Sequence, residues 1–255
     1  MINILKTDFY KAFRATSFWV TSTLVILFSL LESFLIFWGF KMTVDNAELL
    51  DLMGNYIPGF FQAVLGIISQ NIFLSGIFAC VFATSDFTHG TIKNIASKGY
   101  RREYIYASKF ITTLGVTIIH FILCFLTSFI TAQIVIGNKI PDFFKYSNYD
   151  IKNIFALSLQ IIAYISLALL LAMLFRSTGP TIATFLGFIF LEGTFIELID
   201  QFINHVLHQN FSISAYSISR AVADSYMLRG SIVILIYIVI FTLIGMYSFN
   251  KRDIN

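Results

Sequence analysis

Long apolar runs alternate with shorter polar intervals along the 255 residues of this chain. Six of the runs reach the roughly 20 residues that an α-helix needs to cross the hydrocarbon core of a bilayer. The pattern predicts an all-α integral membrane protein, in which a single domain over residues 1–255 forms a bundle of six transmembrane helices. The predicted spans are Phe18–Phe40, Phe60–Thr84, Ile111–Ile136, Ile154–Phe175, Thr181–Phe202 and Ser231–Phe249.

Residues 1–16 show a different pattern from the spans. Apolar side chains recur at helical spacing, and basic side chains fall on the remaining faces. Such a stripe is typical of an amphipathic helix that lies in the membrane surface. We therefore expect an N-terminal interfacial helix here, in preference to a plain charged flank of the first span. The apolar stripe comprises Ile2, Ile4, Leu5, Phe9, Ala12 and Phe13, and the basic residues are Lys6, Lys11 and Arg14.

The polar interval Ser85–Phe110 separates the second and third spans and holds five basic residues against two acidic ones. A short helix is predicted over Asp86–Ser97, with a cap at Asp86 or Thr88 and a stop at Gly99. A further helix should begin after Tyr100 and run into the third span. A short helix held between two spans is well placed to bind a partner protein. The interval is therefore interpreted as a cytoplasmic loop with a coupling helix, in preference to a loop whose basic residues only orient the chain in the membrane.

Two other intervals shape the second half of the bundle. The turn Arg176–Pro180 contains Gly179 and Pro180, which are expected to break the helix and to make the fourth and fifth spans an antiparallel hairpin. Residues 203–230 form a long outer loop that mixes apolar and polar positions. That mixture favours helices that lie in the outer interface or dip back into the membrane.

Composition and charge support a membrane protein and give it an orientation. Charged residues make up 12% of the chain, whereas soluble domains carry about a quarter. With both termini inside, 11 of the 17 Lys and Arg residues fall in cytoplasmic pieces, as the positive-inside rule requires. The net charge of +3 thus reflects membrane orientation, and nothing points to nucleic-acid binding.

Sequence motifs for catalysis are absent from the chain. It contains no Gly-x-x-x-x-Gly-Lys-[Ser/Thr] phosphate loop, no Gly-x-Ser-x-Gly elbow and no His-Glu-x-x-His pair. His205 and His208 share a helical spacing with Asp200 nearby but lack a fourth ligand, so no metal site is predicted. We expect a non-catalytic protein that binds no cofactor itself.

Glu197 is expected near the outer interface, whereas three ionisable residues fall deeper inside the predicted spans, namely Glu32, His120 and Glu192. Such residues are costly in a bilayer and commonly mark a pathway or a contact between helices. They are therefore candidates for a substrate path or a subunit seam. Hydrogen-bonded contacts between helices are an equally weighted alternative for the two glutamates.

The coupling loop resembles a known family. Phe87, Gly90-Thr91-Ile92-Lys93-Asn94, Gly99-Tyr100-Arg101-Arg102 and Ser108-Lys109 are similar to the loop after the second span in permease subunits of bacterial type-2 ATP-binding-cassette (ABC) exporters. This group includes permeases for bacteriocin immunity and peptide export. The resemblance implies that the loop contacts an ATPase through Asp86, Phe87, His89, Gly90, Thr91, Ile92 and Lys93.

The resemblance also implies a working assembly in the bacterial cell membrane. The permease pairs with a second copy or a similar permease and with two ATPase subunits, which hold ATP and magnesium. An amphipathic or antimicrobial peptide is the leading substrate, ahead of a lipid, drug or ion. A self-contained secondary transporter is the alternative, and it would require charged relays and broken helices near the midplane.

Overall fold

The computed structural model describes residues 2–46, 58–91, 100–137, 140, 143–145, 148–207, 218 and 227–251. Within these ranges all regular secondary structure is helical, and six segments are long and apolar enough to cross a membrane. The predicted multi-pass helical membrane protein is therefore confirmed. The helices are α1 (Ile2–Arg14), α2 (Thr16–Asp45), α4 (Phe60–Gln70), α5 (Ile72–Thr88), α7 (Arg102–Val135), α8 (Asn148–Phe175), α9 (Thr178–Leu207) and α10 (Met227–Lys251).

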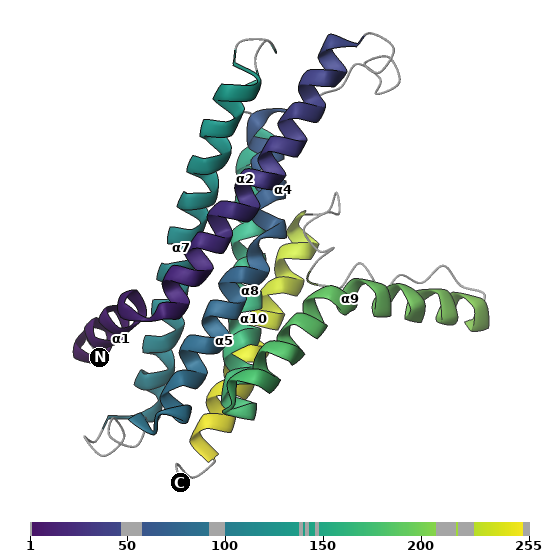
Figure 1. The fold of residues 1–255 in the computed structure, drawn as a ribbon. Coiled ribbons are helices and arrows are strands. Elements are labelled where there is room, and N and C mark those ends of the chain that lie inside the picture. The colour runs from purple at the N-terminus through teal and green to yellow at the C-terminus, as the bar shows by residue number, and fades with distance from the viewer. Residues whose placement is uncertain are drawn as a thin grey trace.

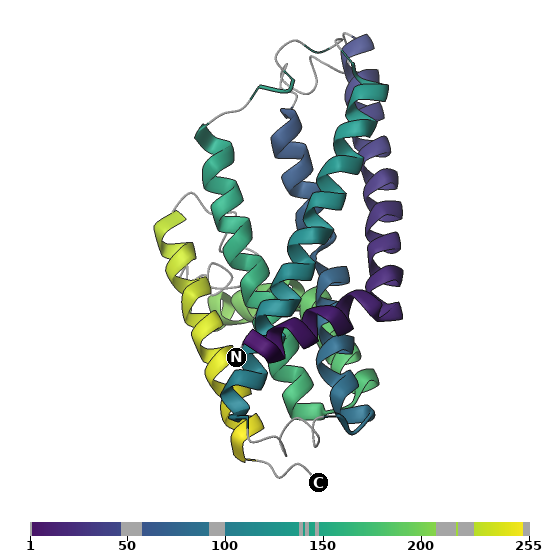
Figure 2. The same cartoon turned by 90° about the vertical axis from the view of Figure 1, so that its left-hand side faces the viewer.

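The helices gather around α8, which packs against α4, α5, α7, α9 and α10 (Figure 1). Helices α2 and α7 run side by side and extend furthest toward the upper end (Figures 1 and 2). Helix α9 leaves the bundle and bends away from it, which leaves most of its apolar surface exposed. Helix α1 and the last turn of α10 lie toward the lower end, near the start of α7.

The N-terminal helix is present as α1, but its apolar stripe is only partly free to face a membrane. Ile4, Asp8 and Ala12 recur every four residues and are buried where α1 packs on α7 and α2. The Phe9 ring fills the space beside Gly115 of α7, where an added Cβ would lie 2.8 Å from the ring. Helix α1 is thus docked on the bundle by one face, and it crosses the long helices at a steep angle (Figure 2).

The second span is not a single helix as predicted. It divides at Asn71 into α4 and α5, and α5 continues to Thr88. The Asn71 side chain donates from Nδ2 to the carbonyl oxygen of Ile67 at 2.9 Å. A local side-chain bond of this kind competes with the helical ladder, which explains the interruption in an otherwise apolar run.

The predicted turn between the fourth and fifth spans exists, but the role given to Gly179 and Pro180 is wrong. Both residues lie in the first turn of α9, which begins at Thr178. Proline is well tolerated there because the first backbone N–H groups of a helix have no partner within it. The reversal takes place at Arg176, whose φ of 52° is in the left-handed region. The predicted outer loop 203–230 lies mostly outside the described residues, and α9 reaches Leu207.

Helix α9 meets the bundle through a close contact with α5. Phe185 of α9 is fully buried, with 0% of its surface exposed, and its ring lies directly over Gly76 of α5. A Cβ atom added at Gly76 would overlap that ring. The absence of a side chain at Gly76 therefore allows α9 to pack on the bundle at this point.

We predict that Gly76→Ala destabilises the protein by about 1–3 kcal/mol, the usual cost of overpacking a core. Thermal unfolding of the purified chain in detergent measures the change. Gly187→Ala on α9 is the matched control, because its added methyl group meets nothing within 4 Å. Combining Gly76→Ala with Phe185→Leu should recover part of the loss. A Gly76→Ala variant as stable as the parent would show that this contact is not tight.

Candidate functional site

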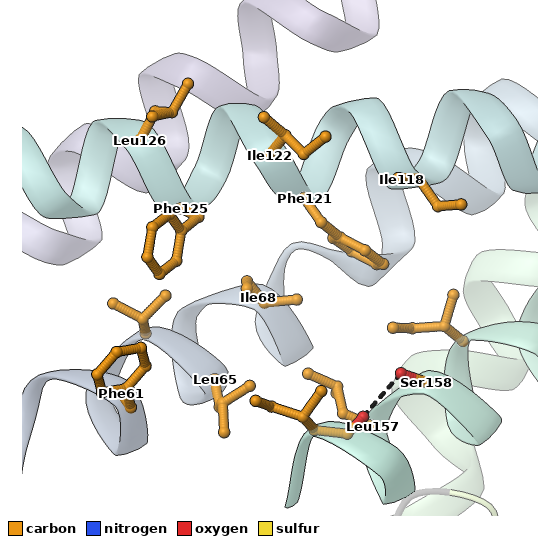
Figure 3. Close-up of a pocket in the computed structure, with 13 residues that line it drawn as sticks. Phe61, Leu65, Ile68, Ile118, Phe121, Ile122, Phe125, Leu126, Leu157 and Ser158 are labelled. Carbon is orange, nitrogen blue, oxygen red and sulfur yellow. Dashed lines mark hydrogen bonds between the residues drawn. The ribbon is translucent and has the colours of Figure 1, made fainter. Parts of the chain in front are cut away.

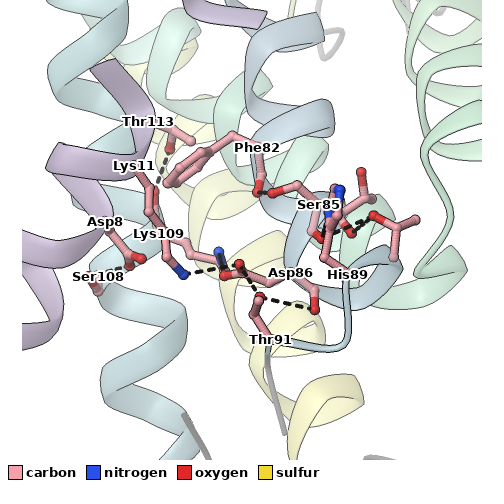
Figure 4. A network of polar contacts seen from close by, with 12 residues as sticks. Asp8, Lys11, Phe82, Ser85, Asp86, His89, Thr91, Ser108, Lys109 and Thr113 are labelled. Atoms are coloured by element: carbon pink, nitrogen blue, oxygen red, sulfur yellow. Dashed lines mark hydrogen bonds and ion pairs between the residues drawn. The ribbon is translucent and has the colours of Figure 1, made fainter. Parts of the chain in front are cut away.

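A buried ion-pair cluster lies at the lower end of the bundle, where α5 ends and α7 begins (Figure 4). Lys109 of α7 donates from Nζ to Asp86 Oδ2 at 2.5 Å, and Lys11 of α1 lies 3.3 Å from Asp86 Oδ1. Thr91 also donates to Oδ1, at 2.6 Å. Only 1% of Lys109 and 5% of Asp86 is exposed. The carboxylate of Asp86 thus joins three helices through two ion pairs, of which the one to Lys109 is buried.

A second acidic residue completes the cluster. Asp8 of α1 is buried and accepts a hydrogen bond from the Ser108 hydroxyl at 2.6 Å. Asp8 and Lys11 are one helical turn apart on α1, and Ser108 and Lys109 are neighbours on α7, so the two helices meet through two polar contacts. The formal charges of the two aspartates and the two lysines cancel, which favours their burial as a group.

The sequence prediction used Lys11 as a basic residue of the N-terminal helix and Lys109 as a loop charge and part of the family resemblance, and it assigned neither these residues nor Asp8 to the site. A signal for the pair was nevertheless present in the chain. Asp86 stands near the end of one apolar run and Lys109 near the start of the next. Because a loop joins antiparallel spans, the two residues face each other at the same membrane end.

The predicted coupling helix Asp86–Ser97 is wrong at its beginning. Asp86 and Thr88 belong to α5, and the chain turns at Gly90, whose φ of 66° is in the left-handed region. Glycine favours that conformation because it has no Cβ. Residues 92–99 lie outside the described residues, and Ile92 and Lys93 are among them. The helix predicted to begin after Tyr100 is confirmed, since α7 begins at Arg102.

Two other residues predicted to contact the ATPase, Phe87 and His89, lie in different surroundings: Phe87 faces the bundle and His89 is exposed. The Phe87 ring contacts the ring of Phe249 in α10, with centroids 6.2 Å apart, and the Arg176 guanidinium lies 5.4 Å from its centroid. His89 is exposed, and its Nδ1 lies 2.7 Å from the carbonyl oxygen of Ser85. Asp86 and Phe87 therefore stabilise the subunit itself, whereas His89 is available at the surface.

The far end of the loop is also fixed. Arg102, the first residue of α7, donates from its guanidinium to the carbonyl oxygens of Phe249 at 3.1 Å and Asn250 at 2.8 Å. These carbonyls belong to the last turn of α10, where a positive charge is favourable. The interval between Thr91 and Arg102 is thus anchored at one end to α1 and α7 and at the other to α10.

His120 lies inside the subunit at the meeting point of α2, α5 and α7. Its Nδ1 lies 3.0 Å from Ser75 Oγ, and its Nε2 lies 3.2 Å from Ser22 Oγ and 3.4 Å from Thr21 Oγ1. The ring also stacks on Phe18, with centroids 6.2 Å apart. Both ring nitrogens have hydroxyl partners, so the contacts around His120 join three helices.

Glu32 lies beside the interruption between α4 and α5. Its Oε2 accepts a hydrogen bond from Asn71 Nδ2 at 2.8 Å, and Asn71 Oδ1 is buried without a partner. A pocket of about 470 Å³ opens here between α2, α4, α5, α8 and α9. Its lining is half polar and half apolar and comprises Glu32, Ser69, Gln70, Ile72, Phe73, Gln160, Tyr164, Ile189 and Phe190.

Glu192 lies on α9 close to the same pocket, but its environment differs. Its Oε2 accepts from the Tyr164 hydroxyl at 3.2 Å, and its Oε1 accepts from the backbone N–H of Ile218 at 2.7 Å. Tyr164 is thus shared between the pocket wall and Glu192. Glu32, His120 and Glu192, which were predicted to form a path, are not brought together. Glu32 lines this pocket and Glu192 lies beside it, whereas His120 lines neither this pocket nor the apolar groove between α4, α7 and α8.

An apolar groove of about 340 Å³ lies between α4, α7 and α8 (Figure 3). Phe61, Leu65 and Ile68 of α4 face Phe121 and Phe125 of α7 across it. Ser158 is the polar residue of the lining, and its hydroxyl donates to the carbonyl oxygen of Ile154 at 2.7 Å. The surface of the groove is almost entirely apolar, so the groove suits hydrocarbon.

Comparison with known families gives one match. The sequence profile of DUF2705, described as a protein of unknown function, matches residues 50–255. This range includes every span after the first, the interval Ser85–Phe110, and both Asp86 and Lys109. No curated protein matches this sequence.

We predict that Asp86→Asn destabilises the purified chain by about 3–5 kcal/mol, because it leaves the buried charge of Lys109 without its partner. Lys109→Met should cost less, because Lys11 and Thr91 still contact the Asp86 carboxylate. The double variant should be closer to the parent than either single variant, since it removes both charges. Thermal unfolding in detergent provides the four values of the double-mutant cycle. Lys6→Met, an exposed lysine of α1, is the control and should change little. Additive losses in the double variant would show that the pair is not coupled.

Proposed function

The chain belongs to the DUF2705 family, and we propose that it is the permease subunit of an ATP-driven ABC exporter. In this proposal a separate ATPase hydrolyses ATP, and the interval between α5 and α7 transmits its movement to the spans. The chain itself is non-catalytic. ATP and magnesium are held by two ATPase copies, and a second copy of this chain or a similar permease completes the membrane part.

The observation that carries this proposal is the fixation of the loop at both ends. Asp86 joins the start of the loop to Lys109 and Lys11, and Arg102 joins its end to α10. A force applied to the loop therefore acts on α1, α5, α7 and α10 together. A loop that served only as a charged anchor would need no buried attachment of this kind. This rigidity supports a coupling role, and the resemblance of the loop to type-2 ABC permeases supports an ATPase as the partner.

The proposed substrate is an amphipathic or antimicrobial peptide, with a lipid, drug or ion as alternatives. The proposed location is the bacterial cell membrane, with both termini and the coupling loop in the cytoplasm. Figures 1 and 2 support a common side, because α1, the end of α5, the start of α7 and the end of α10 lie toward the same end of the bundle. A role of Glu32 and Glu192 in a substrate path or subunit seam remains part of this proposal, whereas His120 is enclosed by α2, α5 and α7 within the subunit.

A secondary transporter is the second candidate function. It is favoured by the interruption of the second span at Asn71, with Glu32 hydrogen-bonded to the residue at the break. Interrupted helices beside an ionisable residue are common at the binding sites of secondary transporters. Such a protein would transport its substrate as a lone chain, without an ATPase.

The first prediction concerns the partner and the loop turn. The tagged chain purified from its native membrane should carry an ATPase, and its substrate should stimulate ATP hydrolysis. Gly90→Val should weaken both, because a β-branched residue is strained at φ 66° by about 1–2 kcal/mol. Gly90→Asn should largely retain both, since asparagine tolerates this conformation.

Comparing Gly90→Val with Gly90→Asn separates the effect of backbone conformation from the effect of losing glycine. Steric contact does not distinguish the two variants, because a Cβ at position 90 meets nothing within 4 Å. Insertion and thermal stability of both variants serve as controls. Equal ATPase recovery with Gly90→Val and Gly90→Asn would show that this turn does not position the docking surface. An active chain that never carries an ATPase would favour the secondary transporter.

The second prediction concerns orientation. Single cysteines at His89 and Lys145, in a background without Cys80 and Cys124, should react with an impermeant thiol reagent from opposite sides. Both positions are exposed, and both native cysteines are buried. In intact cells the reagent should label position 145 but not position 89 until the membrane is opened. Labelling of position 89 in intact cells would reverse the proposed orientation.

A further inference from the structure

The half-polar pocket beside Glu32 is incomplete in a way that points to a ligand. Glu32 is a carboxylate on a membrane-spanning helix, and Asn71 is its hydrogen-bond partner within the described part of the chain. The same asparagine uses both N–H donors, on Glu32 and on Ile67, while its Oδ1 is buried with no donor. Glu32 thus lines the pocket, and among the described residues a hydrogen bond is made to only one of its two carboxyl oxygens.

Comparison with Glu192 shows that this arrangement is specific to one of the two glutamates. Both oxygens of Glu192 accept hydrogen bonds, one from Tyr164 and one from the backbone of Ile218. Glu32 has a partner on one oxygen and lines an open pocket with the rest of its side chain. A carboxylate in such a place is stabilised by a cation that donates hydrogen bonds.

The other half of the pocket limits the type of cation. Ile72, Phe73, Ile189 and Phe190 form apolar walls, and the rings of Phe73 and Phe190 lie 6.0 Å apart. The volume of about 470 Å³ is in the range of pockets for organic ligands and far exceeds the space that a bare ion needs. Aromatic faces also attract ammonium groups.

We propose that this pocket binds an amphipathic organic cation, with its ammonium group at Glu32 and Gln160 and its apolar part against Phe73 and Phe190. The site lies within one subunit, between the interrupted second span and α8 and α9. Its role as a substrate site rests on the proposed function, in which it holds the charged end of the exported molecule. Binding itself requires no ATPase, so the two proposals can fail separately.

The test uses the full chain, purified in detergent, and the reagent dicyclohexylcarbodiimide, which modifies carboxyl groups in apolar surroundings. Mass spectrometry of peptides should find the modification at Glu32. Hexylammonium chloride should protect Glu32 along a one-site curve, so that labelling falls about tenfold at ten times the half-protective concentration. Any labelling of Glu192 should be unaffected. Hexanol and potassium chloride at equal concentrations should not protect.

Two variants on α8 give matched controls. Gln160→Leu removes a polar group from the pocket and should raise the half-protective concentration of hexylammonium about tenfold, the effect of losing a hydrogen bond to a charged group. Ser158→Ala changes a residue of the separate apolar groove and should leave the curve unchanged. In both variants Glu32 should still react.

Several results would overturn the proposal. Absence of reaction at Glu32 would show that the carboxyl is not accessible from the pocket. Equal protection by hexanol would indicate a purely apolar site, and protection by potassium chloride would indicate a site for an inorganic cation. If the pocket binds hexylammonium but no ATPase associates with the chain, the cation site stands and the exporter assignment does not.

Discussion

Charged groups at the end of a membrane-spanning bundle need partners within the protein, and the pairing of Asp86 with Lys109 is the contact on which the lower end of this structure depends. Neither side chain reaches solvent to a useful extent, since 5% and 1% of their surfaces are exposed. The pair joins the end of α5 to the beginning of α7 at 2.5 Å, and Lys11 adds α1. Burial of the pair thus fixes the positions of the end of α5, the beginning of α7 and helix α1 relative to one another.

The same constraint governs the polar contacts deeper in the bundle. Ser29 and Thr127 join α2 to α7 at 2.6 Å, and Thr84 and Thr178 join α5 to α9 at 2.9 Å. His120 joins three helices through hydroxyl groups. Where lipid offers no hydrogen bonds, such contacts fix how helices pair. Glu32 departs from this pattern because its pocket leaves it incompletely surrounded, and this departure is what suggests binding.

Two types of site are thereby separated within one chain. The lower end is rigid, with its charges paired inside the subunit, and it suits transmission of movement. The pocket near the interruption at Asn71 combines the carboxyl group of Glu32 with apolar walls, and it suits recognition of a ligand. Helix α9 lies next to both, through Thr178 at the lower end and through Glu192 and Tyr164 at the pocket.

The sequence alone determined the six spans, the N-terminal helix and the start of α7, because an apolar run of sufficient length has few alternatives in a bilayer. It also indicated Glu32 and Glu192 as unusual, since charge inside a span is costly. Tertiary structure decided their different surroundings, the buried partners of Asp86, the break at Asn71 and the turn at Arg176. These features depend on which helices meet and at what height, and hydrophobic periodicity does not encode which face of one helix will meet which face of another.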